Sequence, residues 1–336
     1  MVTHRGDGLL RATGGTPTYY YAVILPGCRA DRKTPVVNDF ERYSPPMKRH
    51  FLTLAWIAAG CTYPLIVLGA VVRITGSGLG CGNHWPLCNG HLFPPLNDLP
   101  TVIEWSHRLA ATVVSVLVVG LAAVGWRGSG SLESGARGAA YAALVLLIIQ
   151  VLLGAVTVKT GLTPVMVILH LATAILLLAS LIVAARAPYI LTPGSRLLLG
   201  LTFITVLFGA LTANLGATAA CGGFPLCNGQ VIPTAGPLAW VQWTHRLLAY
   251  ALLAVAIWWV AHEPRRAAGL LTIVAVQIAI AATMVELGFP GALQAAHAAV
   301  GAGVWATVVI TTLRPAAGPA AAAAASPPGP TPPYTR

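Results

Sequence analysis

The sequence has few charged residues: Asp, Glu, Lys and Arg together make up 9% of its 336 residues. A water-soluble domain of ordinary composition has about 25%, so this scarcity excludes a soluble globular fold for most of the chain. Acidic residues are the rarer kind, with nine Asp and Glu against twenty Lys and Arg. A dinuclear metal site usually needs several carboxylates. The apolar regions lack them, so such a site is a weak alternative.

Long apolar runs take the place of charge. Hydrophobic residues make up 56% of the chain and the mean hydropathy is +0.75. Eight runs approach the length of about 20 residues that spans a bilayer. They lie at 51–72, 102–126, 139–158, 164–186, 196–217, 240–261, 268–286 and 292–313. The sequence therefore predicts an all-α membrane protein with eight transmembrane helices.

The positions of the basic residues predict the orientation of these helices. A net charge of +11 can indicate nucleic-acid binding, but eight of the twenty Lys and Arg precede residue 51 and most others lie between apolar runs. We therefore expect no nucleic-acid partner. The basic residues of one side are Arg127, Arg137, Arg186, Arg196, Arg265, Arg266 and Arg314. Because basic residues near membrane helices lie mainly on the cytoplasmic side, this pattern predicts both termini in the cytoplasm. The loops 73–101 and 218–239 are then expected outside a bacterial cytoplasmic membrane.

The two ends of the chain are expected to lie outside the bundle. Residues 1–46 are polar, with no apolar region ahead of a cleavage site, and are therefore not expected to be a signal peptide. We expect a disordered cytoplasmic extension over residues 1–50, or a wrongly assigned start in residues 1–46. Residues 314–336 are rich in Ala and Pro and are expected to be a disordered tail.

The two halves of the chain repeat one pattern. GAVVRITGSGLGCGNHWPLCNG, from Gly69, aligns with GALTANLGATAACGGFPLCNG, from Gly209; EWSHRL aligns with QWTHRL further along. Four spans separate equivalent elements, and an even number makes the repeats parallel in the membrane. The prediction is two four-helix bundles, residues 51–186 and 187–313, related by a pseudo-twofold axis along the membrane normal.

Four histidines lie at one predicted depth, five or six residues inside their spans, or about 8 Å from the outer surface. They are His107 and His170 in the first half, and His245 and His297 in the second. Facing imidazoles in a four-helix bundle are the usual protein contribution to a haem site. The alternative is a set of isolated polar residues bonded to neighbouring helices, which the shared depth and the repeat make less favourable.

Charged neighbours of these histidines are candidates for further roles. Arg108 and Arg246 each follow a histidine, and their guanidinium groups could bind haem propionates. Glu104 shares a helix sector with His107 and Arg108, so it is either a proton-handling group or a helix ion-pair partner. The second half has Gln242 instead. Because proton transfer needs a titratable group, this difference predicts a reacting site in the first half and a resident haem in the second.

Cysteine pairs frame the two outer loops, Cys81 with Cys88 and Cys221 with Cys227. The outer compartment permits disulfides, and the pairs are either structural staples or redox-active thiols. A third reading is a metal clip, from the C-x2-H-x3-C-x2-H pattern that ends at His91. The second loop keeps both cysteines and neither histidine, which disfavours the clip.

This ordered combination resembles the haem A synthase family, over about residues 50–313. The resemblance rests on the eight spans, the paired histidines, EWSHR, and the cysteines of WPLCNG and FPLCNG. It implies oxidation of a methyl group of haem O to a formyl group by successive hydroxylation and loss of water. The haem A formed would serve cytochrome oxidase. Haem O synthase and an unidentified electron donor or acceptor would be partners, within the lipid bilayer.

The resemblance also implies roles for residues. Haem b would be the cofactor, held by His245 and His297, and haem O would lie near His107 and His170. Glu104 would lie beside the reacting carbon. The pair Cys81 and Cys88 would take part in activity. The oligomeric state, including a homo-oligomer, stays open.

Two other functions explain part of the pattern. A di-haem, quinol-linked cytochrome b accounts for the four histidines but leaves Glu104 and the outer cysteines without a role. A membrane thiol–disulfide oxidoreductase uses the cysteines but leaves the histidines unexplained.

Overall fold

The computed structural model describes residues 46–95, 97–128 and 130–315. Eight helices in these ranges are long and apolar enough to cross a membrane, as the sequence predicts. They are α2 (Pro46–Ile74), α3 (Leu99–Arg127), α4 (Ser134–Lys159), α5 (Pro164–Arg186), α6 (Pro193–Asn214), α7 (Pro237–His262), α8 (Pro264–Glu286) and α9 (Gly291–Thr312). Short elements complete the fold: β1 (Tyr189–Ile190), the 3-10 helix η1 (Ala217–Ala219) and β2 (Arg314–Pro315), which pairs antiparallel with β1.

Local sequence sets the helix boundaries. Proline stands in the first turn of most helices, where its missing N–H is not needed. Asp98 caps α3 by accepting the Thr101 N–H at 2.9 Å, and this bond holds the pKa of Asp98 below its usual range. Gly161 and Gly288 supply the positive φ of the tight turns α4–α5 and α8–α9. Both tight helical hairpins expected from the sequence are therefore present.

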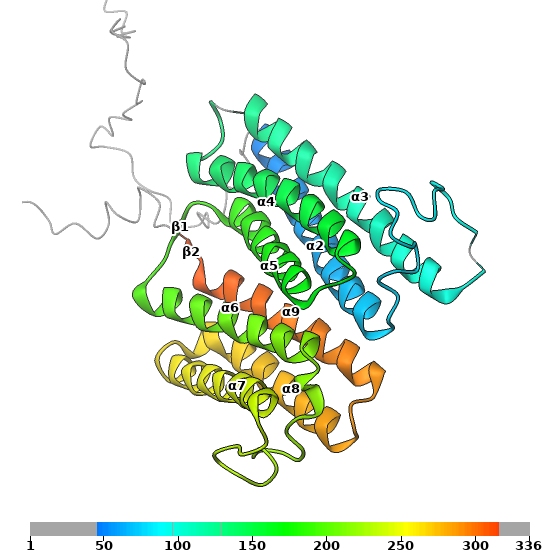
Figure 1. The fold of residues 1–336 in the computed structure, drawn as a ribbon. Helices are drawn as coiled ribbons and strands as arrows, with labels where there is room; N and C mark the ends of the chain where they lie inside the picture. The colour runs from blue at the N-terminus through cyan, green and yellow to red at the C-terminus, as the bar shows by residue number, and fades with distance from the viewer. Residues whose placement is uncertain (1–45, 96, 129, 316–336) are drawn as a thin grey trace, which may run out of the picture. The chain divides into compact units, whose positions relative to one another are not determined.

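The helices form two four-helix bundles, α2–α5 and α6–α9, each a closed ring of neighbours (Figure 1). Between the bundles, α2 contacts α9, α5 contacts α6, and α5 contacts α9. If each helix of the first bundle is exchanged for its equivalent in the second, the α2–α9 contact becomes the α5–α6 contact, and the α5–α9 contact is unchanged. A pseudo-twofold relation requires this pattern. The symmetry axis and its direction stay predictions.

The larger apolar core extends from the first bundle into the contact between the halves. Phe51, Leu121 and Leu178 are among its fully buried side chains. Across the contact, Trp305 of α9 donates its indole N–H to the Ile175 carbonyl of α5 at 2.7 Å. The helices that carry His107, His170 and His297 therefore pack in this core, whereas α7, which carries His245, packs in a second core that includes Leu252, Ala256 and Trp259.

The ends of the bundle differ slightly from the expected boundaries. Residues 46–50, placed with the N-terminal extension, are the first turn of α2, and Arg314–Pro315, placed with the tail, form β2. The expected disorder of the remaining ends, 1–45 and 316–336, lies outside the described residues.

Candidate functional site

The four histidines occupy equivalent places in the two bundles. His107 of α3 and His245 of α7 each lie eight positions after the first residue of their helix, Leu99 and Pro237. His170 of α5 and His297 of α9 each lie six positions after Pro164 and Gly291. Each half thus contributes two histidines at matching depths in its bundle.

The second pair has the spacing of two ligands to one ion. The ring centroids of His245 and His297 are 6.4 Å apart, with an angle of 83° between the planes. Metal–imidazole bonds of about 2 Å place two opposed coordinating nitrogens about 4 Å apart and the ring centres roughly 6 Å apart. The separation of these two rings therefore fits a metal ion between them.

Glycine lets the rings lie close to the neighbouring helix. A Cβ at Gly69 of α2 would be 3.1 Å from Cε1 of His107, and a Cβ at Gly209 of α6 would be 2.9 Å from Cε1 of His245. Real Cβ contacts are essentially never as short as the distance at Gly209 and are seldom as short as the distance at Gly69. The two glycines that open the aligned repeat segments are therefore the residues on which the histidine rings rest.

The donor set suits a haem better than a metal ion bound by protein alone. Within the described ranges, no group of three or more His, Cys, Asp and Glu side chains converges on one point. Two imidazoles per half suffice for a metal that brings four ligands of its own, as haem iron does. Nδ1 of His107 and Nδ1 of His170 are buried and lack hydrogen-bond partners among the described residues. The residues present therefore fit a haem in each half.

Two glutamines that the sequence analysis missed contact these rings. Gln150 of α4 lies 3.0 Å from Nε2 of His170, measured from its Nε2. Gln277 of α8 has its Nε2 3.1 Å from Nδ1 and 3.2 Å from Nε2 of His297, and also donates to the His297 carbonyl at 3.0 Å. Each glutamine precedes its histidine by 20 residues. That equal spacing in the two repeats is the signal that would have identified them.

The two outer loops are closed by the expected disulfides, Cys81–Cys88 and Cys221–Cys227. After the second cysteine of each disulfide the backbone turns in the same way. An isolated antiparallel β-bridge pairs Cys88 with His91 in the first loop, and another pairs Cys227 with Gln230 in the second. Sulfur atoms bonded to each other are not thiolate ligands. The metal clip considered for the first loop is therefore not supported.

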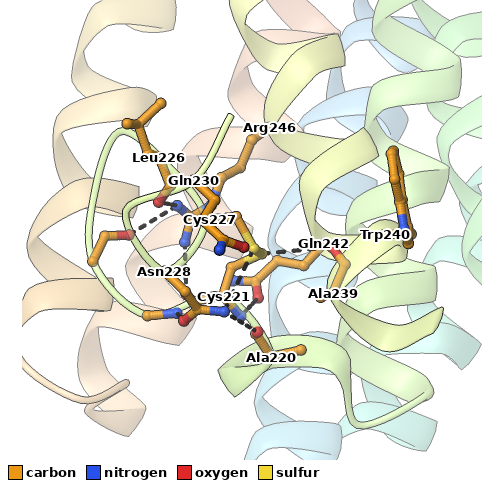
Figure 2. Close-up of a disulfide and its surroundings, with 12 residues drawn as sticks. Ala220, Cys221, Leu226, Cys227, Asn228, Gln230, Ala239, Trp240, Gln242 and Arg246 are labelled. Carbon is orange, nitrogen blue, oxygen red and sulfur yellow. Dashed lines mark hydrogen bonds between the residues drawn. A yellow bond between two sulfur atoms is a disulfide. The ribbon is translucent and has the colours of Figure 1, made fainter. Parts of the chain in front are cut away.

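Glu104 and Gln242 hold these loops by the same hydrogen bond. Oε2 of Glu104 accepts the Cys81 N–H at 2.8 Å, and Oε1 of Gln242 accepts the Cys221 N–H at 2.6 Å. Both side chains are buried, with 4% and 5% of their surface exposed. Figure 2 shows Gln242 directed from α7 at the disulfide of the second loop. Anchoring the loop is thus a role that glutamate and glutamine share.

The arginines beside the histidines bind the outer loops. The guanidinium of Arg108 pairs with Oε1 of Glu104 at 2.5 Å and donates to the carbonyls of His84 and Leu87 at 2.9 Å. The helix ion pair considered for Glu104 is therefore present.

In the second half, Arg246 donates to the carbonyls of Cys221, Gly223 and Leu226, each at 2.8 Å (Figure 2). Both arginines thus bind the loops and have several donors already engaged. Their binding of haem propionates stays a prediction.

The chain is similar to a known family over most of its length. The family COX15-CtaA, cytochrome oxidase assembly protein, matches residues 52–309. A protein of Bacillus pumilus named heme A synthase is 33% identical over 56% of this chain and 67% of its own length. Heme A synthase of Shouchella clausii is 36% identical over 58% and 71%, and that of Bacillus licheniformis is 33% identical over 60% and 72%. The chain therefore belongs to the COX15-CtaA family, and its curated relatives are named as haem A synthases.

Proposed function

We propose that this protein is a haem A synthase, which oxidises a methyl group of haem O to a formyl group and so supplies haem A to cytochrome oxidase. The observation that carries the proposal is the pair of neighbouring imidazoles, His245 and His297, whose helix positions are repeated by His107 and His170 within the span that matches the family. The haem-binding cytochrome and the thiol–disulfide oxidoreductase are not favoured, because the relatives are named as haem A synthases.

We assign the second half to haem b as the resident cofactor. His245 Nδ1 lies 3.1 Å from the Thr205 carbonyl, a contact that occupies this nitrogen and leaves Nε2 for a metal. The equivalent nitrogen of His107 is buried without such a partner. A ring fixed by an outer hydrogen bond suits a permanent ligand, whereas a freer ring suits a substrate that must leave. Haem b, when bound, supplies one-electron transfer.

We assign the first half to haem O as the substrate. His107 and His170 would bind it, and Glu104 would take up protons released as the methyl group is oxidised. Glu104 uses Oε2 for the Cys81 N–H and Oε1 for Arg108. Each carboxylate oxygen has two lone pairs, so both oxygens keep the capacity to accept a proton. The disulfide loop above this carboxylate would limit the access of water.

We also propose that the protein lies in the bacterial cytoplasmic membrane with both termini inside. Basic residues gather at the ends of the helices away from the disulfide loops, as positive-inside requires. Disulfides persist in the compartment outside this membrane rather than in the cytoplasm. Both features support an outward orientation of the loops.

The test is pigment analysis of a host that makes haem O but no haem A. Full-length protein is expressed there, and the extracted haems are separated by chromatography with mass detection. Haem A, or haem O carrying a hydroxylated methyl group, is the expected new pigment. Bound haem b with unchanged haem O, in the presence of a known electron donor, would instead support the di-haem cytochrome.

Gln277→Leu is expected to disturb the resident haem specifically. Loss of an outer hydrogen-bond partner typically weakens metal binding 10- to 100-fold, so haem b content should fall or its midpoint potential should shift. Gln150→Leu is the matched control, since it removes the equivalent contact in the other half. Redox titration and haem b content of the two purified variants provide the measurement. Equal effects of both variants on haem b would contradict the assignment of the halves.

A further inference from the structure

An apolar groove lies in the seam between α2 and α3. Its volume is about 280 Å³, and its lining includes Cys61, Leu65 and Leu68 of α2 with Ala110 and Val114 of α3. Val114 is 2% exposed and is the most deeply buried of these side chains, while the exposed Pro64 lies at the rim. The groove therefore starts in the interior of the bundle and opens sideways, on the surface that would face lipid.

The groove lies next to the contact between His107 and Gly69, because its nearest lining residues are within one helical turn of them in sequence. Leu65 and Cys61 precede Gly69 by four and eight residues, so they lie one and two turns along the same face of α2. Ala110 and Val114 follow His107 by three and seven residues on α3. The lining thus extends about 10 Å from the imidazole, at 1.5 Å per residue, and runs away from the outer loops.

The repeat has bulkier side chains at five of the seven equivalent positions of the second half, and smaller ones at two, where Leu65 becomes Thr205 and Val113 becomes Ala251. With Gly69 aligned to Gly209, Cys61 becomes Leu201 and Pro64 becomes Ile204. With His107 aligned to His245, two replacements on α3 are also larger. They are Ala110 to Leu248 and Val114 to Leu252. At most of these positions, the seam next to His107 therefore has less side-chain volume than the corresponding seam next to His245.

We propose that this groove binds the isoprenoid tail of haem O. The proposal rests on the proposed function and on the assignment of haem O to the first half. Haem O differs from haem b in carrying a long apolar isoprenoid chain, so a protein that holds one of them in each half needs an apolar channel beside only one histidine pair. The groove lies beside His107, where the substrate is assigned.

Direction and lining both match this occupant. Haem propionates require the polar outer rim, near Arg108, and the tail leaves the macrocycle away from them. The groove runs from His107 in the inward direction and is lined by apolar side chains. Because lipid is as apolar as the groove, the gain on binding comes from close packing along two helices. A tail held there fixes the rotation of the macrocycle, and so fixes which methyl group faces Glu104.

The test fills the groove with Ala110→Leu, which gives the first half the side chain of the second. Adding methylenes to a packed site costs enough to weaken binding about tenfold. Haem O and haem b are titrated separately into detergent-purified, full-length protein whose second half already holds haem b. We expect about tenfold weaker binding of haem O and unchanged binding of the tail-less haem b. Val116→Leu is the control for added bulk, because Val116 lies on α3 outside the groove and is 68% exposed.

Three outcomes would overturn the proposal. Equal weakening of both haems would show that Ala110 packs against the macrocycle, and unchanged haem O binding would show that the tail lies elsewhere. Unchanged haem O binding with loss of a co-purified phospholipid would assign the groove to a lipid acyl chain. Since binding is measured without turnover, these results stay separate from the proposed function, which fails if the wild-type protein binds haem O and never forms haem A.

Discussion

Replacing Glu104 by glutamine is expected to leave the haems bound and to slow the conversion of haem O by about 10²- to 10⁴-fold, the usual contribution of a general acid or base. The second half already contains the glutamine form of this site. There, Gln242 accepts the Cys221 N–H at 2.6 Å, as Glu104 accepts the Cys81 N–H at 2.8 Å. An amide can therefore keep the loop in place, but it cannot take up a proton. Turnover per bound haem O is the measurement.

The ion pair with Arg108 does not change this expectation greatly. Arg108 also donates to the carbonyls of His84 and Leu87, so it keeps partners when the carboxylate is replaced. The neutral amide oxygen can still accept one of its N–H groups. Because 16% of the Arg108 side chain and 5% of the Glu104 side chain are exposed, loss of the charged partner is expected to lower stability, and thermal melting of the variant measures that loss separately from the rate.

Glu104→Ala separates the two roles of this side chain. It removes both the proton acceptor and the loop anchor, so it should lower thermal stability as well as turnover. Gln242→Glu is the reciprocal control, which keeps an acceptor for Cys221 in the second half. If Glu104→Gln turned over at the wild-type rate while Glu104→Ala failed, loop anchoring would be the whole function of Glu104 and the proton-handling role would be wrong.

Hydropathy and the internal repeat predict the framework of this protein because both signals are local. Apolar runs alone place all eight helices, with boundaries that differ by a few residues: α2 begins at Pro46 rather than at 51, and α4 at Ser134 rather than at 139. The depth of the histidines follows from their positions in those runs. Paired cysteines at short spacing likewise identify both disulfides.

Partners across helices are what the sequence does not specify. Arg108 and Arg246 are expected from their position to face haem propionates, yet their nearest acceptors include backbone carbonyls of the outer loops, and a backbone group leaves no mark in the sequence. The anchoring bonds of Glu104 and Gln242 were missed for the same reason, since their partners are backbone N–H groups.

The groove beside His107 depends on which helices are neighbours. Cys61 and Ala110 are unremarkable small residues when each is seen in its own apolar run. Their effect appears only when α2 and α3 pack together and the same seam of the other bundle is compared. Differences of side-chain volume between repeats become informative once the packing is known.

His245→Ala is expected to remove haem b almost completely and to abolish the formation of haem A. The variant leaves His297 as a single ligand, and one imidazole cannot hold iron from both faces of the macrocycle. The vacated position lies next to Gly209, where a Cβ would be 2.9 Å from Cε1 of the His245 ring. Removing the ring creates no clash, so the helices can stay in place. Haem b content per protein, measured with helix content by circular dichroism, tests this expectation.

His107→Ala is the matched variant in the first half, and the comparison decides which half holds the cofactor. This variant should keep haem b and lose the binding of haem O. In the wild-type protein, Nδ1 of His107 lacks the fixed partner that the Thr205 carbonyl gives His245, which is why the first half is assigned to the substrate. If His107→Ala lost haem b and His245→Ala kept it, the two halves would exchange roles. Glu104 would then lie beside the electron-transferring haem, where a proton acceptor has no chemical step to serve, and the explanation of the Glu104–Gln242 difference would fail with the assignment.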